Sequence, residues 1–196
     1  SLLKILDYPL AAPSANPFGY ISPTNSQHVQ QQLGNKIPFI LEGEISEVGI
    51  ESTIVGFENE ETVIYRLGGL EVDEIEKLIG KVKTLPHSSS KPDAPGMLKS
   101  HYAPRKNIVL GNIEQLIDQN PTLKLGILSF CKHYKEAEMS LTLSESKDMH
   151  EAAKNLFSHL RKLDESNVDL IIAEKVPSEG LGKAINDRLQ RAAVKE

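Results

Sequence analysis

The stretch that decides the fold runs Ala12-Pro13-Ser14-Ala15-Asn16-Pro17-Phe18-Gly19-Tyr20-Ile21-Ser22-Pro23-Thr24. It places hydroxyls, an amide, three prolines and a glycine between a short apolar run and a predicted helix. Each proline fixes its own φ and restricts the residue before it, so we expect a rigid loop. Small donors in a rigid loop suit a ligand-binding turn, and they also occur in purely structural turns.

A helix is predicted directly after this loop, from Pro23 to Leu33. Ser22 is a favourable N-cap, Pro23 suits the first helical position, and Gly34 can end the helix in the left-handed conformation. The unpaired N–H groups and partial positive charge at such an amino end attract anions, phosphate in particular. The residues alone leave two interpretations open, a phosphate-binding turn or a structural turn with a capped helix.

The rest of the first 84 residues has the pattern of an α/β segment. Apolar residues at helical spacing, followed by Gly80, predict a helix at Val72–Ile79. Apolar and β-branched runs predict strands at Tyr8–Ala12, Ile37–Leu41, Thr53–Phe57 and Thr62–Arg66, with Glu58–Glu61 as a hairpin turn. The run Leu2–Leu6 is compatible with either a helix or a strand. This set of elements fits half of a mixed, twisted sheet.

From Asn107 onward strands and helices alternate, which is typical of a parallel sheet with helices packed on it. The predicted strands are Ile108–Leu110, Leu125–Phe130, Ser140–Leu143 and Val168–Ala173. The predicted helices are Ile113–Gln119, Lys147–Leu163 and Gly182–Ala193. The sequence contains no Gly-x-Gly-x-x-Gly, so the usual dinucleotide-binding loop is not expected.

The two patterned parts are joined by a predicted linker over residues 85–106, rich in proline and serine. Prolines make such a linker extended and semi-rigid. Its first part, residues 85–93, has the composition of a plain spacer. Its second part, Pro95–Pro104, combines methionine, leucine, histidine and tyrosine in a short span. These side chains predict that the second part docks onto the protein.

Composition is that of a folded protein without a bulk affinity for nucleic acid. Hydrophobic residues make up 39% and charged residues 25% of the 196 residues, which argues against intrinsic disorder. The net charge of −5 argues against a broad electrostatic grip on nucleic acid, although it leaves a local basic patch open. No apolar run approaches the roughly 20 residues that span a bilayer. Cys131, the single cysteine, excludes an internal disulfide and favours a reducing, cytoplasmic location.

The loop and four further stretches resemble the threonylcarbamoyl-AMP synthases of the Sua5/YrdC/YwlC family. The stretches are Pro13–Thr24, Gly49–Val55, Tyr65–Gly69, Pro95–Pro104 and Gly180–Leu189, in the family's order. The last two mark the long, two-domain Sua5 form. The resemblance implies a partial YrdC-like mixed twisted sheet over residues 1–84, an interdomain linker over 85–106, and a small Rossmann-like Sua5 domain with a parallel sheet over 107–196.

The resemblance also implies that this chain is the carboxy-terminal portion of a longer synthase. The chain opens at Ser1, and two motifs of the family's amino-terminal half, a Pro-Thr-Glu-Thr-type loop and a Lys/Arg-rich motif, do not occur in it. The lysine expected to meet the triphosphate belongs to that half. We therefore expect this chain to be inactive by itself.

The family reaction joins L-threonine, bicarbonate and ATP into threonylcarbamoyl-AMP and releases pyrophosphate. The product passes to a separate tRNA-modifying transferase complex, which forms threonylcarbamoyladenosine at position 37 of tRNA. The residues that the resemblance assigns are Ser14, Ser22, Arg66 and Tyr102 for ATP, the Ala12 backbone and Ser52 for L-threonine, and Asn16 and Thr53 as supporting residues. The alternatives are a cap or turn hydroxyl for each serine, a surface ion pair for Arg66, and linker packing for Tyr102.

These residue types suit adenylation chemistry. A carboxylate must attack the α-phosphorus of ATP while pyrophosphate leaves, so the protein has to hold phosphate oxygens and align the attack. Hydroxyls and one guanidinium can supply that grip. No residue stands out as a general base, so the catalytic residues stay unassigned. A divalent ion such as Mg²⁺ is expected to travel with the triphosphate, and the spacing of the histidines predicts no protein metal site.

Three hypotheses for the function follow. The first is the synthase, with the linker acting as a lid over the nucleotide. The second is an RNA-binding or regulatory nucleotide-binding module, against which the scarcity of clustered lysine and arginine in residues 1–84 counts. The third gives the Sua5 domain no role beyond supporting the linker. No membrane partner is expected.

Overall fold

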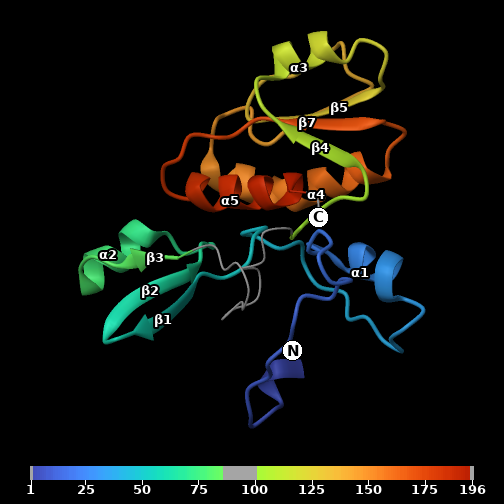
Figure 1. Ribbon diagram of the computed structural model, residues 1–196. Coiled ribbons are helices and arrows are strands. Elements are labelled where there is room, and N and C mark those ends of the chain that lie inside the picture. Colours follow the sequence, from blue (N-terminus) through green and yellow to red (C-terminus); the bar gives the residue numbers. More distant parts are fainter. Residues whose placement is uncertain (1, 86–100, 195–196) are drawn as a thin grey trace.

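The computed structural model describes residues 2–85 and 101–194. Residues 86–100, which hold most of the predicted linker and the Pro95–Ser100 part of its docking segment, lie outside the described residues. The described chain contains a three-stranded mixed sheet and a four-stranded parallel sheet (Figure 1). The predicted α/β class, a mixed sheet followed by a parallel one, is confirmed. None of the described helices is long and apolar enough to cross a membrane.

The parallel sheet consists of β4 (Asn107–Leu110), β5 (Leu125–Ser129), β6 (Met139–Thr142) and β7 (Leu170–Ala173), in the order β4-β7-β5-β6. One face is covered by α3 (Ile113–Gln119), and the other by α4 (Met149–Glu165) and α5 (Gly182–Ala193) (Figure 1). Ile127 and Ile172 share a cluster with α3, whereas Leu128 and Ile171 belong to the core with α4 and α5. The central strands β5 and β7 are buried on both faces and are therefore largely apolar runs. The sequence places all four strands to within two residues.

The mixed sheet is built on a hairpin. β1 (Ile54–Glu58) and β2 (Glu61–Arg66) pair antiparallel, and β3 (Lys83–Thr84) pairs parallel with β2. The turn residues Asn59 and Glu60 have φ values of 50° and 69°, a left-handed conformation that matches the twist of a two-residue hairpin. The helix α2 (Val72–Ile79) follows and ends at Gly80, whose φ is 84°. The predicted hairpin and helix are both confirmed.

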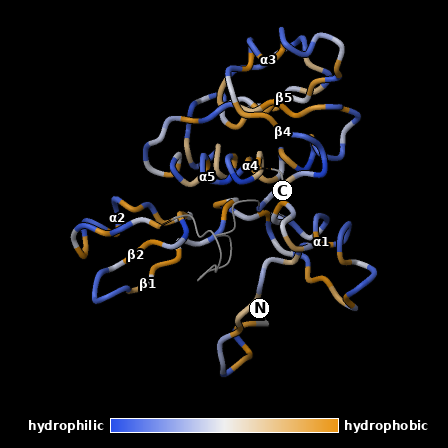
Figure 2. The backbone as a smooth tube through the Cα atoms, viewed as in Figure 1, coloured by the Kyte–Doolittle hydropathy of each residue, from blue (hydrophilic) through white to orange (hydrophobic). Residues whose placement is uncertain are grey.

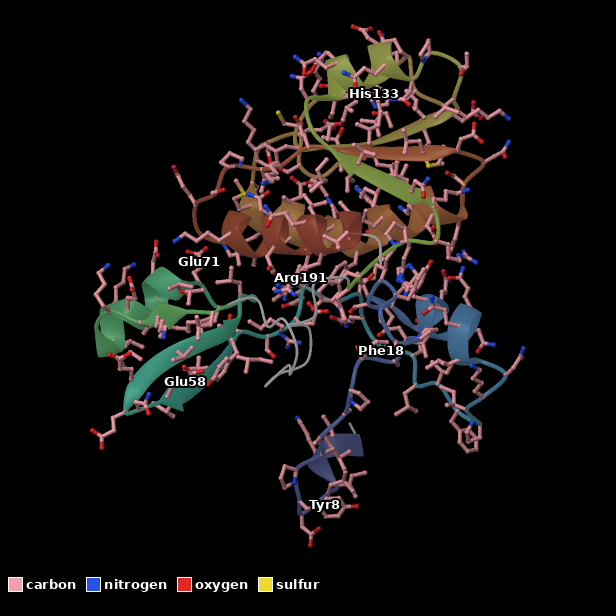
Figure 3. All side chains as sticks on the ribbon, in the orientation of Figure 1. Tyr8, Phe18, Glu58, Glu71, His133 and Arg191 are labelled. Carbon is pink, nitrogen blue, oxygen red and sulfur yellow. The ribbon has the colours of Figure 1, made fainter. Side chains whose placement is uncertain are left out.

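Two strands predicted in the amino-terminal part are wrong. Tyr8–Ala12 and Ile37–Leu41 adopt irregular conformations, and Figure 3 shows Tyr8 on a segment that extends away from the rest of the protein. Phe39 is 84% exposed. A strand needs a neighbour to complete its hydrogen bonds, and the described residues provide none for either stretch. The ambiguous run Leu2–Leu6 contains a short 3₁₀ helix, η1 (Leu2–Lys4).

The helix after the loop starts later than predicted. The cap of α1 (Ser26–Leu33) is Asn25, whose side chain accepts a hydrogen bond from His28 N at 2.9 Å. Ser22 is not the cap, because its hydroxyl donates to Glu51 Oε1 at 2.7 Å. A distant partner therefore outcompetes the local capping role of this serine.

The end of α1 also differs from the prediction. Gly34 has a φ of −55°, so the chain leaves the helix in the right-handed conformation. The N–H groups of Lys36 and Ile37 both donate to Leu33 O. The exposed carbonyl at the helix end is satisfied without a left-handed residue.

The two parts of the chain share one hydrophobic core. Ile21, Ile50 and Tyr102 are buried together with side chains of α4 and α5, among them Phe157 and Leu189. Figure 2 shows apolar stretches in this interior and also along β1 and β2, where Phe57 is 76% exposed. The amino-terminal loop and the end of the linker are thus folded against the parallel-sheet part.

The end of the linker docks as predicted for its described residues, His101–Pro104. His101 N donates to Arg191 O of α5, and Ala103 N donates to Gly19 O of the loop. The side chain of Tyr102 is 1% exposed. This short segment therefore lies between α5 and the amino-terminal loop.

Charged side chains of α4 hold the loop. Arg161, which is 1% exposed, donates to the carbonyl oxygens of Ile21 and Ser22 and, at 3.0 Å, to Gln32 Oε1. One helical turn further on, Asp164 also has a buried side chain. The loop belongs to no helix or sheet, so these contacts satisfy carbonyl groups that regular structure does not pair.

The carboxylate of Asp164 accepts three hydrogen bonds. The donors are Tyr20 Oη at 2.6 Å, Arg105 Nε at 3.1 Å and Lys106 N at 2.9 Å. Desolvation, followed by the bond to Asp164, raises the pKa of Tyr20 to about 12. One residue of α4 thus ties the loop and the start of β4 together.

Replacing Phe157 by alanine is expected to lower the free energy of unfolding by about 3–5 kcal/mol, because its buried ring leaves a cavity that its neighbours cannot fill. The matched control is Phe39→Ala, at an exposed phenylalanine, with an expected change within about 0.5 kcal/mol. Chemical denaturation followed by circular dichroism measures both. Equal losses in the two variants would contradict the location of the core.

Unfolding is expected to become easier in mild acid. Burial, together with nearby cations, lowers the pKa of His28 and of His159 to about 4, against about 6.5 in the unfolded chain. Between these values the unfolded state binds more protons, so the free energy of unfolding falls as the pH drops from about 6.5 to about 4. Urea titrations at several pH values should show a shallower fall for His159→Gln than for the wild type. The control is His150→Gln, at an exposed position, which should keep the wild-type slope.

Candidate functional site

A cavity of about 420 Å³ opens between the loop, the residues before β1, the end of β2 and the end of the linker. Its lining residues are Ala12, Pro13, Ser14, Glu51, Ser52, Arg66, His101 and Tyr102. The predicted site residues Ala12, Ser14, Ser52, Arg66 and Tyr102 therefore converge on one cavity, although they come from separate segments. Their roles toward ligands stay predictions.

Arg66 lies at the end of β2 and contacts Ser52 across the hairpin. Its Nε donates to Ser52 O at 3.0 Å and its Nη2 donates to Ser52 Oγ at 3.3 Å. Just beyond it, a Cβ at Gly68 would lie 2.3 Å from backbone atoms of Ser52 and Thr53. Only glycine lets the chain pass this close, and the close approach keeps the guanidinium against the cavity wall.

Glu51 forms the back of this wall. Its Oε2 accepts hydrogen bonds from Arg188 Nε at 3.2 Å and Nη2 at 3.1 Å, and its Oε1 accepts from Ser22 Oγ at 2.7 Å. Burial alone would raise the pKa of Glu51, but the Arg188 guanidinium and the serine hydroxyl outweigh it and lower that pKa. The cavity is therefore bordered by an ionised carboxylate as well as a guanidinium.

Ser22, a predicted ATP ligand, lies behind the wall and outside the cavity lining. It is 6% exposed, and its hydroxyl proton is donated to Glu51. Of the residues that the structure describes, none from α1 lines the cavity. The anion site predicted at the start of this helix is therefore not part of the cavity, because the helix begins at Ser26 and is capped by Asn25.

Tyr102 closes the cavity from the side of α4 and α5. Its ring stacks on Phe157 with a centroid distance of 5.3 Å, and Arg188 Cζ lies 5.2 Å from the ring centroid. Its φ of 61° is unusual for a bulky residue and indicates a conformation imposed by the surroundings. Its buried hydroxyl has no hydrogen-bond partner among the described residues. The ring therefore packs against Phe157, as the linker-packing alternative for Tyr102 predicts. Its hydroxyl group keeps the capacity to form a hydrogen bond with a ligand.

His101 borders the same cavity. Its ring lies edge-on to Tyr102 at 4.1 Å, and its Nδ1 is buried without a hydrogen-bond partner in the described part of the chain. Burial, opposed by Glu51 and aided by Arg191, lowers the pKa of His101. The imidazole is therefore neutral at neutral pH and can either donate or accept a hydrogen bond.

The two predicted supporting residues lie outside the cavity lining. Asn16 Nδ2 donates to Tyr20 O at 2.9 Å and so closes the loop on itself. Thr53 Oγ1 donates to Leu70 O at 2.6 Å and fastens the residue before β1 to the segment before α2. Both contacts order backbone next to the cavity.

Three residues of the site received no role from the sequence, namely Glu51, His101 and Arg188. Each lies inside a stretch that carries the family resemblance, so a signal was present in its position. The signal is incomplete because Arg188 and Glu51 are 137 residues apart, and spacing alone cannot pair them. Figure 3 shows Arg191, one turn after this arginine, on the side of α5 that faces the amino-terminal segments.

Two further cavities lie away from the site residues described above. One, of about 360 Å³, lies between α3 and the loop after β5, where Figure 3 labels His133. The other, of about 380 Å³, is bordered by Tyr20 and Arg105. Among residues 2–85 and 101–194, no group of three or more His, Cys, Asp or Glu side chains is placed to hold a metal ion.

Replacing Gly68 by alanine is expected to cost about 1–3 kcal/mol of unfolding free energy, because the new Cβ meets backbone atoms that cannot move aside cheaply. The control is Gly43→Ala, where a Cβ meets nothing within 4 Å. Thermal denaturation of both variants gives the comparison. A Gly68→Ala protein as stable as Gly43→Ala would contradict the close approach of the two strand ends.

Comparisons with known proteins cover nearly the whole chain. A profile described as the C-terminal domain of threonylcarbamoyl-AMP synthase matches residues 70–194, and one described as telomere recombination matches residues 1–68. Proteins named threonylcarbamoyl-AMP synthase from Pyrococcus abyssi and Bacillus subtilis are 35% and 34% identical over 98% of this chain. The match covers 60% and 59% of those proteins, so the chain spans about three fifths of their length.

The fold has close counterparts among solved structures. The crystal structure of P. abyssi Sua5 complexed with L-threonine matches with a TM-score of 0.85 and 35% identity, over 93% of this chain and 57% of that one. A double variant of the same protein matches with a TM-score of 0.82 and 33% identity, over 92% of this chain and 56% of that one. With sequence and fold in agreement, this chain belongs to the family of threonylcarbamoyl-AMP synthases.

Proposed function

We propose that this chain forms part of an L-threonylcarbamoyladenylate synthase, a nucleotidyltransferase that joins L-threonine, bicarbonate and ATP and releases pyrophosphate. The observation that carries the proposal is the convergence of Ser14, Ser52 and Arg66 on one cavity. The L-threonine complex of the P. abyssi relative supports the amino-acid substrate. The nucleotide and bicarbonate follow from the chemistry that a threonylcarbamoyl-AMP product requires.

In this proposal different residues of the cavity bind L-threonine and ATP. The Ala12 backbone and the Ser52 hydroxyl hold L-threonine, while Ser14 and Arg66 hold the phosphates of ATP. A guanidinium can bind two phosphate oxygens at once and offset the charge that develops as pyrophosphate leaves. The Tyr102 hydroxyl, which has no hydrogen-bond partner among the described residues, would also contact the nucleotide.

A contact between Ser22 and ATP would require Ser22 to break an existing hydrogen bond. Its hydroxyl has one proton, and that proton is donated to Glu51. Ser22 can donate to a phosphate oxygen only by giving up this bond. The predicted ATP contact of Ser22 therefore requires a change in the Glu51 wall when the nucleotide binds.

The attacking group is the carboxylate of threonylcarbamate, and the bond that breaks joins the α- and β-phosphates. A carbamate is already an anion, so this step needs alignment and charge compensation more than a base. Mg²⁺ would enter with the triphosphate, whose oxygens are the ligands it prefers. The adenylate product would then be consumed by a tRNA-modifying transferase complex.

The test uses the longest natural polypeptide that contains this chain. Pyrophosphate release should depend on L-threonine, bicarbonate and ATP together. Arg66→Met should raise the KM for ATP about 10- to 100-fold, the range expected on losing a charged hydrogen-bond donor to phosphate. Lys81→Met, which removes an exposed ion pair with Glu76 outside the cavity lining, should leave the KM unchanged.

The 196-residue chain alone forms a second arm of the experiment, in which we expect L-threonine binding by calorimetry without turnover. Pyrophosphate release by the longest polypeptide that did not depend on L-threonine would refute the proposed function. Release of pyrophosphate by the 196-residue chain would refute only the expectation that it is inactive by itself. A steep salt dependence of tRNA binding would favour the RNA-binding alternative.

A further inference from the structure

Arg188 of α5 is a buried guanidinium to which the proposed reaction gives no role. Its side chain is 0% exposed. Its Nε and Nη2 both donate to Glu51 Oε2, and its Nη1 donates to Asp187 Oδ2 at 3.0 Å. Buried arginines are rare unless paired, and each of these bonds ends on a carboxylate.

Glu51 is held from two directions at once. One carboxylate oxygen accepts from Arg188, and the other accepts from Ser22. A carboxylate divided in this way has a fixed rotation about its last bond, because turning it would break both contacts. The next residue, Ser52, lines the cavity and is a proposed L-threonine ligand.

The support behind Arg188 is rigid. Its neighbours along α5, Ile185 and Leu189, are fully buried. Asp187 also binds Arg191 Nε, with both carboxylate oxygens at 3.0 Å. The guanidinium further lies 5.2 Å from the ring centre of Tyr102, which also lines the cavity. One arginine of the parallel-sheet part therefore lies against two residues that line the cavity.

We propose that Arg188 is a positioning residue of the synthase site, which fixes Glu51 and through it the Ser22 hydroxyl and the wall that carries Ser52. The proposal rests on the proposed function, since it concerns the same cavity. It gives the carboxy-terminal part of the chain a role in substrate binding beyond supporting the linker. Arg188 itself touches no substrate in this arrangement.

The alternative is that Arg188 and Glu51 form a purely structural ion pair. The structural role and the positioning role predict different effects of substituting Arg188. A structural pair would affect the free energy of unfolding and leave the kinetics of the folded enzyme alone. A positioning residue changes the KM for L-threonine and ATP in protein that is still folded. A displaced ligand-binding wall can change rates on the order of 100-fold even when the altered residue is remote from the reacting atoms.

The pH profile gives a second distinction. The charged and titratable groups around Glu51 are Arg188, Asp187 and Arg191 of α5, Arg66 of β2, and His101 and Tyr102 at the end of the linker. Without Arg188, burial becomes the dominant influence and raises the pKa of Glu51. The acid limb of kcat/KM should then move to higher pH, and Glu51→Gln should remove that limb because the titrating group is gone.

The experiment compares Arg188→Met, Arg188→Lys and the double variant Arg188→Met/Glu51→Gln in the longest natural polypeptide. Lys132→Met, which removes an exposed ion pair with Glu114 in the same part of the fold, is the control. We expect Arg188→Met to raise the KM for both substrates on the order of 100-fold and to shift the acid limb upward. Arg188→Lys keeps the charge but loses the two-point grip, so it should raise the KM less and keep the wild-type limb.

Wild-type KM values and pH profiles in both Arg188→Met and Arg188→Lys would refute the positioning role. If Arg188→Met does not fold, a wild-type KM in Arg188→Lys is sufficient to refute it. A wild-type enzyme without L-threonine-dependent pyrophosphate release would instead refute the proposed function, so the two failures are distinguishable. An acid limb that persists unchanged in the double variant would show that Glu51 is not the group that titrates, and would also count against the proposal.

Discussion

The ion pair between Glu51 and Arg188 is the contact on which the site depends. Removing an ion from water costs several kcal/mol, so each partner can stay buried only while the other is in place. The pair crosses 137 residues of sequence and joins the cavity wall to α5. Its value lies in fixed geometry more than in net stability, since a well-packed apolar pair can be as stable as a buried salt bridge.

The same logic applies to α4, which holds the loop that borders the cavity. Arg161 donates hydrogen bonds to backbone carbonyls of the loop. Asp164 accepts hydrogen bonds from Tyr20 of the loop and from the residues before β4. The loop that carries Ser14 has little regular structure, so its shape is set by these helices. Regular elements of the parallel-sheet part thus supply the rigidity that the irregular part of the site lacks.

Much of the fold could be predicted because its signals are local. The strands β5 and β7 are continuous apolar runs, and the hairpin of β1 and β2 is marked by its turn residues. Tyr8–Ala12 and Ile37–Leu41 carry strand-like composition, but a strand also needs a partner, and composition does not reveal one.

The site was only partly predictable, for a related reason. Ser14, Ser52 and Arg66 were identified from motifs, and they do meet in one cavity. Ser22 has the sequence context of an N-cap, yet Glu51, 29 residues away, takes its hydroxyl. Contacts of this range follow from how the parts pack, and no local pattern of residues specifies them.

The interleaved core has a consequence for how the polypeptide could be divided. Ile21 and Ile50 come from before the linker and Tyr102 from its end, yet all three lie in one interior with α4 and α5. A proteolytic cut between residues 85 and 101 would therefore yield two pieces that remain associated, joined by apolar packing and by a salt bridge shielded from solvent. In this protein, cleavage of the chain between these residues would not by itself separate the two pieces.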